Sequence, residues 1–139
     1  PEHLKTEAAL LKLKLKAIDI SNSLEGGTEL AAHFKKDHQG ITGIVSLLDA
    51  ATIGFVNSAA DFGISIPKDL SIIGVNMLES QAESTQPSIS TVAFDAYEMA
   101  KSCGKMMVES IEAGKNNKKK RTELWVGDFV DRGSATHNQ

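Results

Sequence analysis

The sequence predicts an α/β protein, with a three-layer α/β/α arrangement and a mostly parallel sheet. Two near-continuous apolar runs, Ile44–Leu48 and Leu70–Val75, are typical of parallel strands that are buried on both faces. Between these runs, apolar residues recur at helical spacing in Ala50–Phe62. The stretch from Ile41 to Asn76 therefore predicts a right-handed β-α-β unit, and further strands and helices alternate on either side of it.

Individual residues predict where the central helix begins and ends. Asp49 directly precedes this helix, and a carboxylate there can accept hydrogen bonds from the amides of the first helical turn. Gly63 follows the helix as a C-terminal cap, and Pro67 prevents any continuation. Gly54 lies inside the helix, where we expect the absence of a side chain to allow close packing of the helix on a strand.

Upstream of this unit we expect a helix, a strand and a second helix. Pro1–Leu11 has a helical apolar face, and Leu13–Ile20 alternates as a strand does, although its first residues are also compatible with a longer helix. Gly26 and Gly27 precede the second helix, which ends at Gly40. The apolar face of this second helix consists of Leu30, Ala31 and Phe34.

Downstream of the unit we expect one long helix among shorter elements. This helix is expected to bury Cys103 on its apolar face, as core rather than as a nucleophile. The basic run Lys115–Arg121 lacks interleaved aromatic residues, so we interpret it as a solvated turn and not as a nucleic-acid site. The elements are a polar loop at Glu79–Gln86, a strand at Ser90–Phe94, a helix at Tyr97–Ala113, and strands at Glu123–Val126 and Phe129–Arg132.

Composition limits the class of protein. The chain has 139 residues, of which 41% are hydrophobic and 24% charged, and these proportions are ordinary for one globular domain. A net charge of −3 does not favour binding to a polyanion, and a single cysteine excludes an internal disulfide. We expect no membrane segment, no metal site and no cofactor. No sequence motif of an enzyme class is present, so catalysis is not expected.

Three segments in order carry a resemblance to a known family. They are DFGISIPKDLSIIGVN at 61–76, PSISTV at 87–92 and FVDRGS at 129–134. From about Ser21 to Ala135 the chain resembles the effector-binding domain of LacI/GalR-family transcriptional regulators, which have a periplasmic-binding-protein-like type I fold. The resemblance implies a fragment, since a DNA-binding head and a first lobe would precede Pro1. It divides the chain into an effector-binding C-terminal lobe (1–94), a helix and strand that cross to the N-terminal lobe (95–127), and a final strand and tail (128–139).

The resemblance implies an allosteric function. A small-molecule effector would bind between two lobes and control operator binding through head domains outside this sequence. Asn22, Leu48, Asp49 and Asn76 match effector-binding positions, and a plain helix cap remains the alternative role for Asp49. Asn76 stands where the family usually has an aspartate, so the effector is left open as sugar-like or purine-like.

The resemblance also implies a homodimer. The helix Tyr97–Ala113 and the strand after it would lack the lobe on which they pack, so we expect a fragment that associates readily. The matching interface residues are Ile53, Val56, Asn57, Glu79 and Ala82, although the apolar ones are also compatible with a place in the core.

Two interpretations of the whole protein follow. A transcriptional regulator would be cytoplasmic and would carry a helix-turn-helix upstream of this segment. A solute-binding receptor for transport or chemosensing would have the same fold and a secretory signal instead. The amino-acid sequences of the 61–76 and 129–134 segments favour the regulator.

Overall fold

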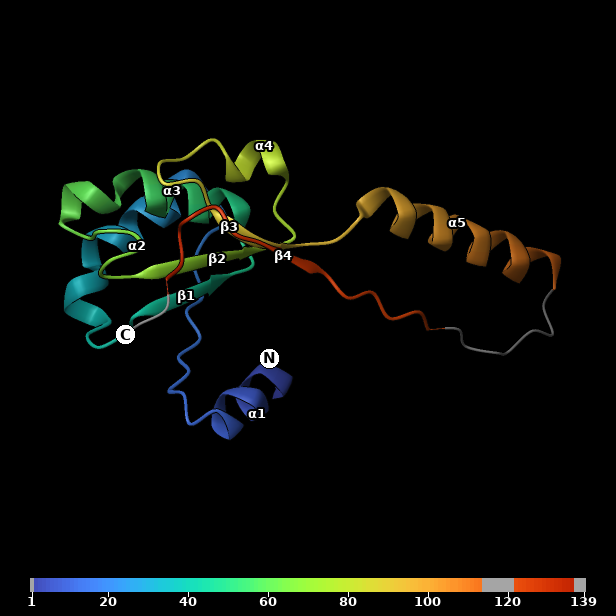
Figure 1. Ribbon diagram of the computed structural model, residues 1–139, viewed down its shortest axis with the longest axis horizontal. Coiled ribbons are helices and arrows are strands. Elements are labelled where there is room, and N and C mark those ends of the chain that lie inside the picture. Colours follow the sequence, from blue (N-terminus) through green and yellow to red (C-terminus); the bar gives the residue numbers. More distant parts are fainter. Residues whose placement is uncertain (1, 114–121, 137–139) are drawn as a thin grey trace.

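In residues 2–113 and 122–136, which the computed structural model describes, four strands form a single sheet (Figure 1). Three of them are parallel, and the last is antiparallel to its neighbour. The predicted α/β class and the mostly parallel sheet are therefore confirmed. In spatial order the strands are β1 (Gly43–Ser46), β2 (Ser71–Val75), β3 (Ser90–Ala93) and β4 (Asp128–Val130).

Two helices, α2 (Leu24–Asp37) and α3 (Asp49–Ala59), pack on each other and on the same face of the sheet (Figure 1). The rings of Phe34 and Phe55 meet edge to face, with centroids 5.4 Å apart, at the centre of this layer. A short 3-10 helix, η1 (Ala60–Phe62), follows α3. The buried core consists of Ala31, Phe34, Phe55, Val56, Ala59, Ile64, Leu70, Ile72, Met77, Ala82 and Ile89.

Two glycines make the contact between α2 and α3 very close. A Cβ at Gly27 would lie 2.6 Å from the backbone nitrogen of Phe55, and a Cβ at Gly54 would lie 2.8 Å from the carbonyl carbon of Leu24. Real side chains do not approach backbone atoms so closely, so this packing requires glycine at both positions. The prediction that Gly54 permits packing on a strand was wrong, because the neighbour is the first turn of α2.

The helices begin and end at the predicted residues only in part. Gly63 adopts the left-handed conformation with φ of 72° and ends η1, as predicted. α2 begins before its glycine pair rather than after it, because the hydroxyl of Ser23 accepts a hydrogen bond from the Gly26 amide and caps the helix. A short helix, α4 (Glu79–Ala82), replaces the beginning of the polar loop that we expected.

Two extended segments that we predicted as strands join no sheet in the described part of the chain. Residues 13–20 are irregular, and Leu13 and Leu15 are exposed. Residues 123–126 are also irregular, with Leu124 and Val126 exposed. Alternation indicates that a segment has two different faces. A strand additionally needs a neighbour that exchanges backbone hydrogen bonds with it, and these segments have none.

β1 is an edge strand, and only one of its faces is covered. Ile44 points towards α2 and α3, whereas Val45, on the other face, is 63% exposed. The prediction that this run is buried on both faces was therefore wrong. The helices α1 (Glu2–Leu10) and α5 (Ala96–Glu112) lie away from the sheet and do not form the second helical layer that we expected on that face (Figure 1).

α5 projects from the body of the molecule and contributes nothing to its core (Figure 1). It has no buried residue, and Cys103 is exposed, so the predicted burial of this cysteine was wrong. Met107 and Ile111 on the same helix are also exposed. The basic run at 115–121, which we interpreted as a turn, lies outside the described residues.

The glycine contact leads to a stability prediction. We expect Gly27→Ala and Gly54→Ala each to lower the free energy of unfolding by about 1–3 kcal/mol, because the new methyl group forces α2 and α3 apart. Gly104→Ala on α5 is the control, since a Cβ there meets nothing within 4 Å, and it should leave stability unchanged or raise it by up to about 1 kcal/mol. Urea unfolding followed by circular dichroism measures all three. Equal stability of the three variants would contradict the close contact.

Candidate functional site

The carboxyl ends of the parallel strands bring three of the four predicted effector-binding residues to one edge of the sheet. Ser46 at the end of β1 pairs with Gly74 near the end of β2. Leu48 and Asp49 follow the first strand and Asn76 follows the second, so these three residues leave the sheet at the same edge. Open α/β sheets bind ligands at this edge.

Asn22, the fourth predicted residue, is exposed in the loop that precedes α2. Ile20, two residues earlier, lines a small apolar hollow together with Ile44 and Ile72. This contact holds the beginning of the loop beside β1 and β2. The hollow is apolar apart from Ser46 and Thr52, whose hydroxyls bond to each other, so polar recognition at this edge depends on the loop residues.

Asp49 does not cap α3, which corrects the structural role that we considered for it. Leu48 occupies the N-cap position and makes no side-chain cap bond, and Asp49 is the first helical residue. The turn is instead held by Thr52, whose hydroxyl lies 2.7 Å from the carbonyl oxygen of Leu48 and 2.6 Å from the hydroxyl of Ser46. Among the contacts described, none engages the Asp49 carboxylate, which remains available at the positive end of the α3 dipole.

Asn76 directly follows β2 and adopts the left-handed conformation, with φ of 59°. Its backbone amide donates to the carbonyl oxygen of Val92 at 2.7 Å, so the parallel ladder continues up to this residue. Asn is one of the few residues that adopt this conformation at low cost, and the turn directs the chain away from the sheet. Met77, buried immediately afterwards, holds the turn against the core. The side chain of Asn76 is exposed at the edge and offers both a donor and an acceptor.

The five residues predicted for a dimer interface have different environments. Asn57 on α3 and Glu79 on α4 are exposed. Ile53 is half-buried and packs against the core, while Val56 and Ala82 belong to the core itself, with exposed fractions of 3% and 0%. A partner surface on this side of the molecule would therefore be built on Asn57 and Glu79.

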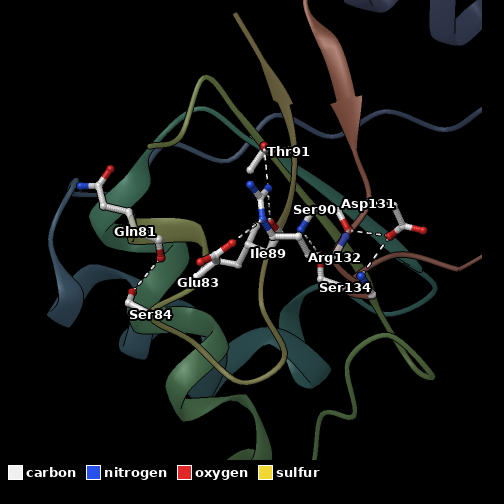
Figure 2. Close-up of polar contacts among 10 residues, drawn as sticks. Gln81, Glu83, Ser84, Ile89, Ser90, Thr91, Asp131, Arg132 and Ser134 are labelled. Atoms are coloured by element: carbon white, nitrogen blue, oxygen red, sulfur yellow. Dashed lines mark hydrogen bonds and ion pairs between the residues drawn. The ribbon is translucent and has the colours of Figure 1, made fainter. Parts of the chain in front are cut away.

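A polar cluster at the C-terminal end of the described chain was not predicted as a site, although its residues lie in the FVDRGS and PSISTV segments (Figure 2). Ser134 is fully buried and bonds to two strands at once. Its hydroxyl donates to the carbonyl oxygen of Ile72 at 2.6 Å and accepts from the amide of Ser90 at 2.7 Å. The amide of Ile72 in turn donates to the carbonyl oxygen of Ser134 at 2.8 Å. Ser134 thereby satisfies the backbone groups of Ile72 on the side of β2 where β3 has not yet begun.

Arg132 and Asp131 extend this cluster (Figure 2). The guanidinium of Arg132 contacts the hydroxyl of Thr91 at 3.2 Å and the carbonyl oxygen of Ile89 at 3.4 Å, and its Nε lies 3.6 Å from the carboxylate of Glu83. Asp131 accepts from the hydroxyl of Ser90 at 3.0 Å. The available signal was the pair Ser90 and Thr91, two polar residues between the apolar Ile89 and Val92, but the partners of Ser90 are more than 40 positions away in the chain.

Two further findings concern other kinds of site. Within the described residues, no group of three or more His, Cys, Asp or Glu side chains is arranged to hold a metal ion. No helix in this part of the chain is long and apolar enough to span a membrane.

Comparisons with known proteins agree on one family. Residues 4–135 match the model of the periplasmic binding protein-like domain. The HTH-type transcriptional regulator MalR of Clostridium butyricum is 30% identical over 71% of this chain, and a regulator from the aml 5′ region of Streptomyces limosus is 32% identical over 81%. The chain spans about a third of the length of these relatives (30% and 31%).

Solved structures share the fold. A LacI-family regulator of Arthrobacter sp. FB24, crystallised with lactose, superimposes with a TM-score of 0.80 at 23% identity, over 97% of this chain and 50% of its own. A LacI-family regulator of Enterococcus faecium with bound ribose gives 0.79 at 23% identity, over 99% of this chain and 51% of its own.

The buried hydroxyl of Ser134 leads to a second stability prediction. We expect Ser134→Ala to lower the free energy of unfolding by about 2 kcal/mol or more, because it leaves the Ile72 carbonyl and the Ser90 amide buried without this partner. Ser84→Ala is the matched control. It removes an exposed hydroxyl that donates to the Gln81 carbonyl at 2.7 Å, and it should cost less than about 0.5 kcal/mol. Thermal and urea unfolding measure both variants. Equal losses of stability would contradict the stabilising role of the Ser134 hydroxyl.

Proposed function

The chain belongs to the family of periplasmic binding protein-like domains, and we propose that it is the effector-binding part of a LacI/GalR-type transcriptional regulator. The observation that carries the proposal is the family match over residues 4–135, combined with curated relatives that are themselves HTH-type transcriptional regulators. The resemblance first drawn from the three sequence segments is thereby confirmed. The activity of the whole protein remains part of the proposal, because this chain spans about a third of those relatives.

We divide the chain at the two connections that join α5 to the body, one after β3 and one before β4. Residues 1–94 would form the effector-binding lobe, 95–127 would pack on a second lobe, and 128–139 would return to the first. The exposed apolar residues of α5 and of the segment after it support this division, since a helix without buried residues needs a further surface to cover it. The TM-scores near 0.8 to chains twice as long are in keeping with such a second lobe.

The proposed mechanism is allosteric. A small molecule binds between the lobes, with Asn22, Leu48, Asp49 and Asn76 on the wall that this chain supplies. Its greater affinity for the closed arrangement changes the geometry of paired DNA-binding heads and hence the occupancy of the operator. The heads belong to the rest of the protein, so this chain contacts operator DNA only through them. A regulator of this kind acts in the cytoplasm.

We propose a sugar-like effector before a purine-like one. The carboxylate of Asp49 accepts hydrogen bonds, and the amide of Asn76 both donates and accepts, which matches the hydroxyl groups of a sugar. The solved relatives that contain lactose and ribose support this choice. Leu48 contributes an apolar contact in place of a polar one. We propose no catalytic step and no cofactor.

A solute-binding receptor of the same fold is the second candidate. It would place its ligand at the same edge of the sheet but would have no DNA-binding head. The helix-turn-helix regulators among the relatives favour the first candidate. The gene region upstream of the codon for Pro1 distinguishes the two by its product, either a helix-turn-helix or a secretory signal.

Titration with sugars tests the proposed site. We expect lactose or ribose at millimolar concentration to shift the backbone amide resonances around Asp49 and Asn76, because one wall of a cleft binds weakly. Asn76→Gly, which keeps the left-handed turn, should weaken binding about 3- to 10-fold, as expected for the loss of a hydrogen bond. Asn57→Ala, an exposed asparagine away from the edge, is the control. Shifts confined to other elements, or equal effects of the two variants, would refute the site.

Light scattering tests the proposed dimer. We expect the 139-residue chain to form a dimer whose population rises with concentration, and Asn57→Arg to weaken it by introducing a bulky charge on the α3 surface. Glu29→Arg, on the exposed side of α2, is the control. A monomer at high concentration would count against any dimer, and equal weakening by both variants would count against this face.

A further inference from the structure

Arg132 follows β4, and within the described cluster of Figure 2 it is the only residue that contacts both the beginning of β3 and the end of α4. Its guanidinium contacts Ile89 directly before β3 and Thr91 within β3, and Arg132 lies two residues beyond Val130, the last residue of β4. Its Nε faces Glu83, directly after α4. The side chain of Arg132 is only 13% exposed, whereas that of Glu83 is 55% exposed, so the arginine is largely buried and its ion pair lies at the surface.

The position of this residue matters because α5 connects with the body through only two described strands. The chain leaves through β3 and returns through β4, and α5 itself has no buried residue (Figure 1). Any displacement of the part that contains α5 therefore reaches the body as a change in the β3–β4 pair. Arg132 lies where this pair ends.

The end of α4, on the other side of Arg132, is joined to the approach to β3 by few hydrogen bonds, although Ala82 itself is buried in the core. α4 has four residues, and its end is tied to the approach to β3 by one backbone bond, from the Ile89 amide to the Ala82 carbonyl oxygen at 2.8 Å. The guanidinium adds a second tie at the same place, through Glu83 and the Ile89 carbonyl. A planar guanidinium with several fixed donors can hold three partners at once, which a lysine ammonium does less well.

We propose that Arg132 is a positioning residue that makes α4 follow the β3–β4 pair, so that a change in these strands is transmitted to α4. Because α4 lies between Asn76 and β3, the transmitted change would reach both the candidate edge and the exposed Glu79. The consequence for effector binding and dimerisation rests on the proposed function. The transmission itself is a property of this chain alone, so it can fail while the proposed function holds, and the reverse.

Hydrogen exchange by NMR on the 139-residue chain tests the transmission with a matched pair of perturbations. Gly127→Ala disturbs the entry to β4, since a Cβ there would lie 2.8 Å from Cγ1 of Val92 and 2.9 Å from the carbonyl oxygen of Ala93. Gly104→Ala on α5 has open space around it and is the control. The readout is the exchange rate of the Ala82 and Glu83 amides relative to the amides of Thr52 and Ile64, which donate to Leu48 and Ala59 away from β4 and Arg132 and therefore correct for global stability.

We expect Gly127→Ala to raise this ratio about fivefold or more with Arg132 in place, and less than twofold in an Arg132→Lys background. Gly104→Ala should leave the ratio unchanged in both backgrounds. Phe129→Ala, which trims a half-exposed side chain on β4, provides a milder perturbation if Gly127→Ala does not fold. The proposal is overturned if the strand variants leave the ratio unchanged with Arg132 present, or raise it equally in both backgrounds. A uniform rise of all four amides would make Arg132 a stabilising residue only.

Discussion

The close contact between α2 and α3 is the constraint on which the rest of the structure depends. Gly27 and Gly54 let each helix touch the backbone of the other, and the edge-to-face rings of Phe34 and Phe55 continue the contact towards the sheet. With the helices this close, both cover the same face of a narrow sheet, and the first turn of α2 lies beside α3. The loop with Asn22 is thereby held near the carboxyl ends of β1 and β2, so a packing requirement inside the protein determines where its candidate site is.

The second organising feature is the return of the chain after β4. The start of β2 pairs with β1 on one side but has no strand on the other side, because β3 begins only opposite Ile73. Ser134 fills this position with one backbone bond and one hydroxyl that serves two strands. Buried polar groups of this kind stabilise only when every partner is present, which makes the closing segment an integral part of the sheet and not a loose tail.

The accuracy of sequence-based inference follows the range of the interactions involved. The β-α-β unit and the turn at Gly63 could be predicted because apolar runs, helical spacing and a left-handed glycine are local properties. Leu13–Ile20 and Glu123–Val126 could not, because pairing depends on a strand elsewhere in the chain. The predicted burial of Cys103 was wrong for a related reason. The sequence of an amphipathic helix shows that it has an apolar face but not which other element covers that face. At the candidate site, topology carried Leu48, Asp49 and Asn76 to one edge, while the role of Thr52 in holding that turn was invisible in the sequence.

The exposed apolar surfaces and the candidate site have a common physical explanation. An isolated α/β domain buries such residues, yet here Val45, Met107, Ile111 and Leu124 are all exposed on three separate parts of the chain. The polar edge residues Asp49 and Asn76 are similarly without a facing partner among the described residues. Both observations are expected if this chain supplies one side of larger contacts: helix faces that pack on a second lobe, and one wall of a cleft. In the proposed arrangement, one wall alone would bind an effector weakly, and the two walls together would bind it more tightly.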